Sequence, residues 1–122
     1  MYWSAPDQRT TALCLREWIA QRFAVAIGRV HDHPVGPHTQ PMYQVAFTVD
    51  VLPRFLPWLL LNRHGLSVLI HPNTGWARDD HTLHALWLGA PLPLLSDSLP
   101  NELGAESISL PLINTTPDRS SE

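Results

Sequence analysis

The sequence is short of several residue types that carry common chemistries. Among its 122 residues there is no lysine, so all eight basic residues are arginine. A Schiff base needs a lysine amine, so this kind of covalent catalysis is excluded. The single cysteine, Cys14, cannot form an internal disulfide, and its place in a helical pattern predicts a small buried apolar side chain. Redox and zinc-thiolate chemistry are therefore not expected.

Charge and long apolar runs are also scarce. Charged residues make up 16% of the chain and the net charge is −3, which argues against a face that binds nucleic acid. The longest apolar runs, such as residues 55–61, are too short to span a bilayer, and no charged segment followed by an apolar one opens the chain. We expect a soluble cytoplasmic protein with no membrane partner.

Histidine, in contrast, is abundant. Most of the seven histidines lie in two segments, 31–38 and 71–84, and imidazole is the main reactive side chain of the sequence. Imidazoles near carboxylates suit Zn or non-haem Fe(II), but no pattern such as His-Glu-x-x-His defines a metal site. His33 and His64 are expected to be ordinary hydrogen-bonding side chains. The candidates for a functional role are His38, His71, His81 and His84.

The length predicts one domain, and the residue pattern predicts its elements. Apolar residues at helical spacing indicate a helix over 6–22 and a second over 51–63, which Asp50 would cap, Pro57 would kink or delay, and Gly65 would end. Four strands are predicted, the first two of them antiparallel neighbours: 24–30, 42–48, 66–70 and 84–88. We expect a domain over 1–93 and a loosely packed or disordered tail over 94–122.

This order of elements becomes a ferredoxin-like split βαβ sandwich if one strand precedes Trp3. Such a sheet has one face covered by helices and one open face, so dimerisation would bury the open face. The fold also separates the histidines, because the strands before His38 and His71 end at opposite ends of the sheet. These two side chains would converge only if the loop 31–41 folds over the open face or a partner subunit contributes.

Several segments resemble the DOPA 4,5-dioxygenase family. They are GRVHDHPVGPH at 28–38, PMYQVAF at 41–47, PWLLLNR at 57–63, HPNTG at 71–75 and DHTLHALWLG at 80–89. The segments follow the family's order, and the resemblance extends over roughly residues 2–93. The resemblance implies a dimeric α+β barrel with the ferredoxin-like fold. It also implies extradiol cleavage of a catechol such as L-DOPA by dioxygen and non-haem Fe(II), in a homodimer.

The resemblance further implies roles for individual residues. His38 and His71 would be metal ligands, and together with His81 they would supply the catalytic acid and base. The implied substrate-binding residues are His31, Tyr43, Gln44 and His84. The role of each histidine among these stays open.

One departure bears on the metal. Members of the family begin with a His-x-His pair on the first strand, immediately before the equivalent of Tyr2, and this chain begins after that point. Either the start lies too far downstream or the protein is a degenerate homologue. The alternative function is a non-catalytic dimeric α+β module that binds a small aromatic molecule or a protein, its metal site lost with the first strand. A protein that binds Zn at the remaining histidines is a third possibility.

Overall fold

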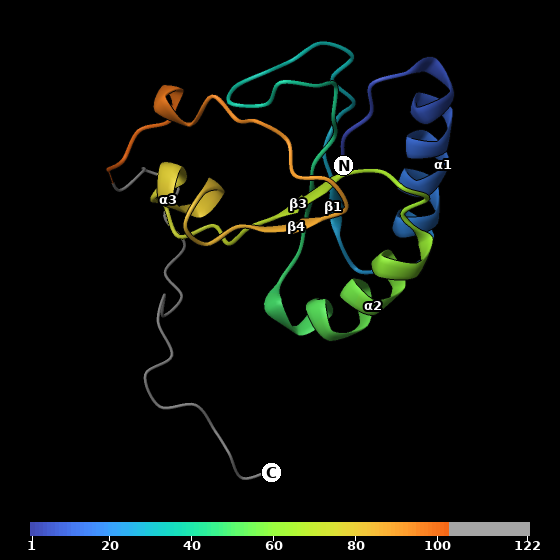
Figure 1. Cartoon of the computed structure of the whole chain (residues 1–122). Coiled ribbons are helices and arrows are strands. Elements are labelled where there is room, and N and C mark those ends of the chain that lie inside the picture. Colours follow the sequence, from blue (N-terminus) through green and yellow to red (C-terminus); the bar gives the residue numbers. More distant parts are fainter. Residues whose placement is uncertain (103–122) are drawn as a thin grey trace, which may run out of the picture.

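The computed structural model describes residues 1–102, and the predicted tail beyond residue 102 lies outside them. The described chain is α+β, as expected, with helices and two antiparallel hairpins (Figure 1). The elements are α1 (Pro6–Arg22), β1 (Ala26–Ile27), β2 (Val45–Ala46), η1 (Val49–Val51), α2 (Leu52–Asn62), β3 (Val68–Ile70), α3 (Ala77–His81), β4 (Leu86–Leu88) and η2 (Ser96–Ser98). No helix among these residues is long and apolar enough to cross a membrane.

Helix α1 occupies the predicted range, and its buried stripe consists of Ala12, Leu15 and Ile19. Three- and four-residue spacing places these side chains on one face, toward the core. The prediction for Cys14 is wrong, because its side chain is exposed. Cys14 precedes Leu15 by one residue and is thereby turned about 100° away from the buried stripe.

The predicted antiparallel pairing of the first two strands is confirmed, and the third and fourth strands are also paired, with all strands shorter than expected. Strand β1 pairs antiparallel with β2, and β3 pairs antiparallel with β4. Residues 1–3 run between the hairpins: the Tyr2 amide donates to Ser67 O at 3.0 Å, and the Trp3 amide donates to Pro41 O at 3.2 Å. Tyr2 also forms an antiparallel bridge with Met42. The first residues of the chain thus join the two hairpins, where a ferredoxin-like sheet has its first strand.

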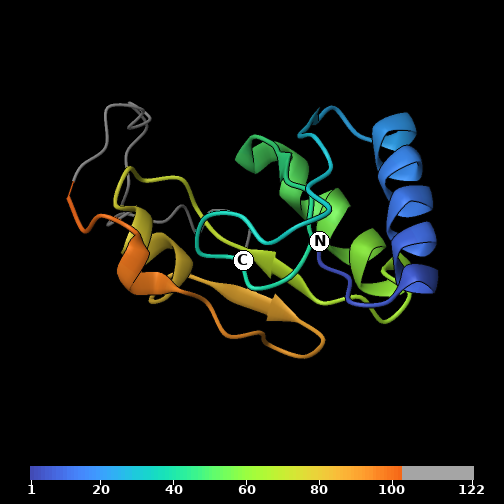
Figure 2. The same cartoon turned by 90° about the horizontal axis from the view of Figure 1, so that it is seen from above.

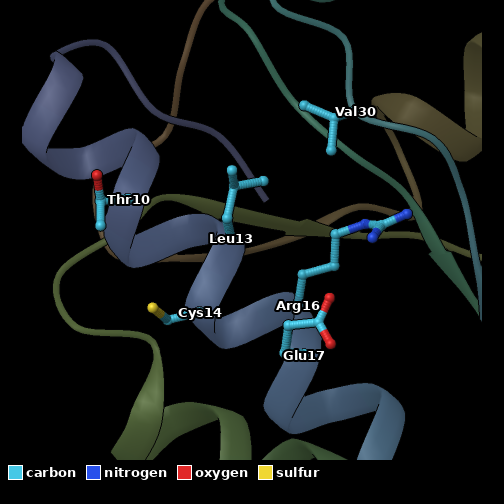
Figure 3. Close-up of a pocket in the computed structure, with 6 residues that line it drawn as sticks. All are labelled: Thr10, Leu13, Cys14, Arg16, Glu17 and Val30. Carbon is cyan, nitrogen blue, oxygen red and sulfur yellow. The ribbon is translucent and has the colours of Figure 1, made fainter.

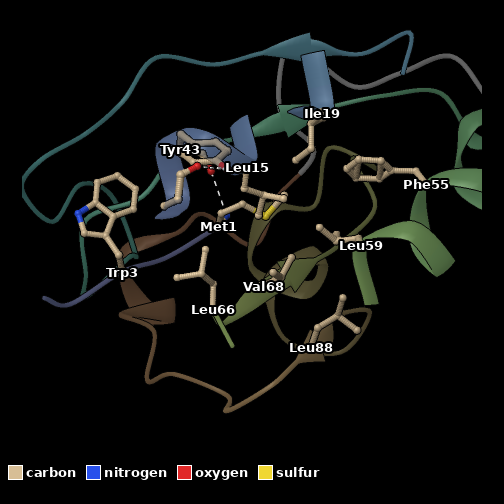
Figure 4. Packing of buried hydrophobic residues seen from close by; sticks show 11 residues of the cluster. Met1, Trp3, Leu15, Ile19, Tyr43, Phe55, Leu59, Leu66, Val68 and Leu88 are labelled. Atoms are coloured by element: carbon tan, nitrogen blue, oxygen red, sulfur yellow. Dashed lines mark hydrogen bonds between the residues drawn. The ribbon is translucent and has the colours of Figure 1, made fainter. Parts of the chain in front are cut away.

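The core lies where α1 and α2 pack against the hairpins and residues 1–3 (Figure 4). Tyr43 is fully buried there, and its hydroxyl donates to the backbone oxygen of Ala12 at 2.8 Å. The Met1 ammonium donates to Tyr43 O at 3.0 Å in the same cluster. The members are Met1, Trp3, Ala12, Leu15, Ile19, Tyr43, Phe55, Leu59, Leu66, Val68 and Leu88.

Helix α2 begins differently from the prediction and ends as predicted. Asp50 lies within η1 and is not the N-cap, because Val51 takes that position without a capping side chain. The helix continues through Pro57, which is exposed, so water can reach the carbonyl group that lacks its usual amide donor. After Asn62 the chain turns through a left-handed conformation at Gly65, with φ of 78°.

Two features of the C-terminal part differ from the expected pattern. The five-residue helix α3 connects β3 to β4 in the sequence and lies beyond one end of these strands, at the opposite end from α1 (Figures 1 and 2). Residues 94–102, assigned to the tail by the sequence, include η2 and pack against α3. The Arg78 guanidinium, for example, donates two hydrogen bonds to Leu99 O at 2.9 and 3.2 Å.

Candidate functional site

Three of the predicted site histidines come together within one chain. His38 lies in the loop between β1 and β2, His71 directly follows β3, and His81 ends α3. The ring centroids of His71 and His81 are 4.0 Å apart, and those of His38 and His81 are 5.9 Å apart. We call His38, His71 and His81 the histidine cluster.

The loop 31–41 reaches the cluster because it folds over and bonds to the segment after β4. The Leu95 amide donates to Pro37 O at 2.8 Å, and the Thr39 hydroxyl donates to Pro93 O at 2.7 Å. His38 itself forms an antiparallel bridge with Leu94. Of the two arrangements that the topology allowed, the structure shows the folded loop, and no partner subunit is needed to bring His38 near His71.

A buried carboxylate organises the turn that carries His81. Asp80 is only 2% exposed, and it accepts hydrogen bonds from the Thr74 amide at 2.9 Å and the Thr74 hydroxyl at 2.6 Å. These two bonds close the segment 74–80 into a compact unit. The position of the His81 backbone is therefore fixed by its neighbour in sequence.

The backbone also fixes the hydrogen position on two of the imidazole rings. His71 Nδ1 lies 2.8 Å from Pro72 O, and His81 Nδ1 lies 2.7 Å from Ala77 O. A carbonyl oxygen only accepts, so in the neutral ring Nδ1 carries the hydrogen and Nε2 keeps its lone pair. His71 and His81 thus each offer a basic nitrogen that no described hydrogen bond occupies.

Burial lowers the pKa of two imidazoles of the cluster. The pKa of His38 falls to about 4, mainly because the ring is buried and also because the imidazole of His81 lies beside it. Burial also lowers the pKa of His71, which a hydrogen bond to Pro72 partly offsets. Both rings are neutral near pH 7, the form in which an imidazole accepts a proton or binds a metal.

Two aromatic residues complete the site, and sequence reasoning did not assign them to it. The Tyr2 ring stacks on Trp87 with centroids 5.7 Å apart, and the Tyr2 hydroxyl lies 2.7 Å from His38 Nδ1. No spacing in the sequence connects residues 2 and 38. The only available signal in the sequence was the strand expected before Trp3.

The other predicted site residues are not members of the cluster. Tyr43 is a core residue whose hydroxyl bonds the backbone of α1, and its substrate-binding role stays a prediction. His84 has an exposed side chain, as does Gln44, and the Gln44 carbonyl accepts a hydrogen bond from the Gly28 amide at 2.7 Å. His31 pairs through its backbone with Met42 and makes no side-chain hydrogen bond within residues 1–102.

A hollow in the surface lies away from the cluster. It is on the outer side of α1, and its lining contains no histidine (Figure 3). The residues that line it are Thr10, Leu13, Cys14, Arg16, Glu17 and Val30. This hollow therefore contributes no imidazole, and the histidine cluster remains the candidate site for acid-base chemistry or metal binding.

The expected Fe(II) can be tested against these side chains. An imidazole that donates through Nδ1 to a backbone oxygen and leaves Nε2 free is the usual form of a histidine metal ligand. However, no three His, Cys, Asp or Glu side chains within residues 1–102 are arranged to hold a metal ion. The described residues have suitable donor chemistry and do not by themselves form an iron centre.

Comparisons with known proteins agree on one family. The family model of the Dopa 4,5-dioxygenase family matches residues 1–98. The chain is 46% identical to a "putative dioxygenase" from Nostoc punctiforme, whose crystal structure superposes with a TM-score of 0.77 over 80% of this chain and 84% of that one.

Two curated fungal relatives are longer than this chain. An uncharacterised 21.2 kDa protein of Botryotinia fuckeliana is 41% identical over 97 residues, which are 72% of this chain and 53% of that protein. A DOPA 4,5-dioxygenase of Amanita muscaria is 34% identical over 77 residues, 63% of this chain and 34% of that protein. The chain spans about half, or less, of the length of these relatives. With a family model matched over residues 1–98, the chain belongs to the Dopa 4,5-dioxygenase family.

Proposed function

We propose that the protein catalyses extradiol cleavage of a catechol such as L-DOPA, with dioxygen as oxidant and non-haem Fe(II) as cofactor. The observation that carries this proposal is the histidine cluster, in which three imidazoles converge within a chain of the Dopa 4,5-dioxygenase family. Ring cleavage requires removal of a phenolic proton, and a neutral imidazole held near the substrate is suited to that task.

The chain's own residues would divide the work as follows. The Nε2 lone pairs of His71 and His81 accept hydrogen bonds or a proton from catechol hydroxyl groups, because backbone bonds hold each ring by Nδ1. The ring of Trp87, which stacks on the buried Tyr2, offers an aromatic surface near the cluster. The iron belongs to this proposal through the family alone.

The test is an oxygenation assay on the purified chain. The protein is incubated anaerobically with Fe(II), then exposed to dioxygen and L-DOPA, and dioxygen uptake and a yellow ring-opened product are followed together. We expect both signals in the wild type. His71→Gln should reduce the rate roughly 100-fold, because a general base contributes at least that much. Absence of product with L-DOPA and several other catechols would overturn the proposal.

His64→Asn serves as the matched control. His64 is exposed and adopts a φ of 53°, a conformation that asparagine tolerates, so the change removes an imidazole without disturbing the backbone. We expect the rate of this variant to stay close to that of the wild type. Thermal unfolding of both variants shows whether a lost rate reflects a lost fold.

One observation favours a second function. Because no three ligating side chains converge within residues 1–102, the described part of the chain also suits a module that binds an aromatic molecule without converting it. Calorimetric titration of L-DOPA into the protein, combined with the oxygenation assay, separates the two. Binding without dioxygen uptake would support the module and contradict the enzyme.

A further inference from the structure

The rings of the histidine cluster differ in what holds them. His71 and His81 face backbone carbonyl oxygens through Nδ1, whereas Nδ1 of His38 faces the hydroxyl of Tyr2 at 2.7 Å. A carbonyl group only accepts a hydrogen bond, but a phenol both donates and accepts. The hydroxyl of Tyr2 can therefore impose on His38 a tautomer that the backbone does not impose on the other two rings.

The surroundings of Tyr2 decide the direction of this bond. Tyr2 is 2% exposed, and its hydroxyl carries a proton that it can donate. The only described partner of that proton is His38 Nδ1. A buried hydroxyl whose proton has no acceptor is costly, so Tyr2 donates and His38 Nδ1 accepts.

In a neutral imidazole one nitrogen carries the hydrogen and the other does not. Because His38 accepts at Nδ1, its hydrogen lies on Nε2, the reverse of His71 and His81. The cluster then presents two accepting nitrogens and one donating N–H group. This combination suits a catechol in which one oxygen atom has lost its proton while the other oxygen keeps it.

We propose that Tyr2 sets the tautomer of His38, so that this ring presents N–H at Nε2 and donates a hydrogen bond to an oxygen atom of the substrate. Tyr2 is then a positioning residue, and His38 is a hydrogen-bond donor rather than a metal ligand through Nε2. The tautomer follows from the contacts of these two residues alone. The contact with a catechol oxygen rests on the proposed function.

The experiment is nitrogen-15 NMR of the histidine rings at pH 7.5, in which two-bond couplings distinguish the two tautomers. The His38 signals are assigned by their loss in His38→Gln. For the wild type we expect hydrogen on Nε2 of His38 and on Nδ1 of His71 and His81. In Tyr2→Phe, which removes only the hydroxyl, the His38 signals should move toward a mixture of both tautomers.

Tyr43→Phe is the matched control, since it also removes a buried tyrosine hydroxyl bonded at 2.8 Å, but to a backbone oxygen of α1. The His38 signals should be unchanged in this variant. Hydrogen on Nδ1 of His38 in the wild type would overturn the proposal, and this measurement stands even if Tyr2→Phe does not fold.

Activity separates this inference from the proposed function. If the wild type cleaves a catechol, Tyr2→Phe should lower kcat/KM by about tenfold, the scale of a lost partner that orients a functional imidazole. A shifted tautomer with unchanged kcat/KM would overturn the role of His38 toward substrate. If no catechol is cleaved, the proposed function is wrong. The nitrogen-15 signals of His38 still show which tautomer the ring adopts, so the inference about Tyr2 is tested separately.

Discussion

At the scale of single residues, His38 links the site to the stability of the fold. Its folded-state pKa of about 4 lies below the ordinary value of 6.5, because the ring is partly buried beside other imidazoles. Between these two values the unfolded chain binds a proton that the folded chain does not. The contribution of His38 to stability is therefore complete above about pH 6.5 and is lost as the pH falls toward 4.

We predict that His38→Gln removes part of this pH dependence. The free energy of unfolding of the wild type should fall between pH 7 and pH 4.5, and the variant should lose less, by on the order of 1 kcal/mol after allowance for solvent screening of a half-buried ring. Urea denaturation at both pH values, without added metal, measures the difference. Identical pH dependence in the two proteins would contradict the assigned burial of His38.

Single-residue chemistry could be predicted from the sequence only in part. The shortage of other reactive groups drew attention to histidine, and the resemblance selected the three that converge. Tyr2 was missed because its role depends on a contact with a residue 36 positions away. The burial of Tyr43 could not be foreseen, because a tyrosine that bonds a carbonyl group of the core has the same sequence pattern as one that lines a site.

At the scale of elements, helix α3 is held by contacts rather than by its own propensity. It has five residues, and isolated helices of that length are unstable in water. We predict that Asp80→Ala lowers the free energy of unfolding by about 2–3 kcal/mol, since the amide and hydroxyl of Thr74 both lose their acceptor. Asp80→Asn, which keeps one acceptor oxygen, should lose less.

Guanidinium denaturation checks this order, with Asp97→Ala as the control. Asp97 is an exposed aspartate of η2, so its replacement should change the free energy of unfolding by no more than about 0.5 kcal/mol. Equal stability of Asp80→Ala and Asp97→Ala would show that the buried carboxylate does not hold the turn. Because Asp80 adjoins His81, the His81 ring signals should also shift in Asp80→Ala.

The same physics explains which elements the sequence revealed. Helix α1 was predicted with its observed bounds, because seventeen residues carry a clear stripe and a proline in the first turn. Helix α3 was missed because five residues are too few for a periodic pattern. The strands are shorter than predicted because their apolar runs continue beyond the few residues that are paired with a neighbour.

At the scale of the whole molecule, the site depends on contacts between distant parts of the chain. Residues 1–3 join the two hairpins and bring Tyr2 to the cluster, while residues 93–95 hold the loop that carries His38. Neither connection follows from local pattern, since each depends on how separate elements pack. The fold class was therefore predictable, whereas the meeting of the histidines within one chain needed the structure.

The contacts of residues 93–95 with the loop 31–41 can be tested in a shortened chain. A chain that ends at residue 92 lacks the acceptor of Thr39, the donor to Pro37 and the bridge at His38, but keeps every member of the hydrophobic core. We predict faster hydrogen exchange throughout the loop 31–41, with exchange in α1 unchanged. The loop 31–41 should open more often because its hydrogen bonds to residues 93–95 are lost, whereas the buried residues of α1 keep their packing in the core.

The control is a chain that ends at residue 102, which retains all of these contacts and should show slower exchange in the loop than the chain that ends at 92. Exchange measured by mass spectrometry on peptides from 31–41 and from α1 gives both readings in one experiment. If the loop exchanges equally in the two chains, residues 93–95 do not hold it. Since the same loop carries His38, the chain that ends at 92 should also lose the fixed tautomer of His38 while Tyr2 remains in place.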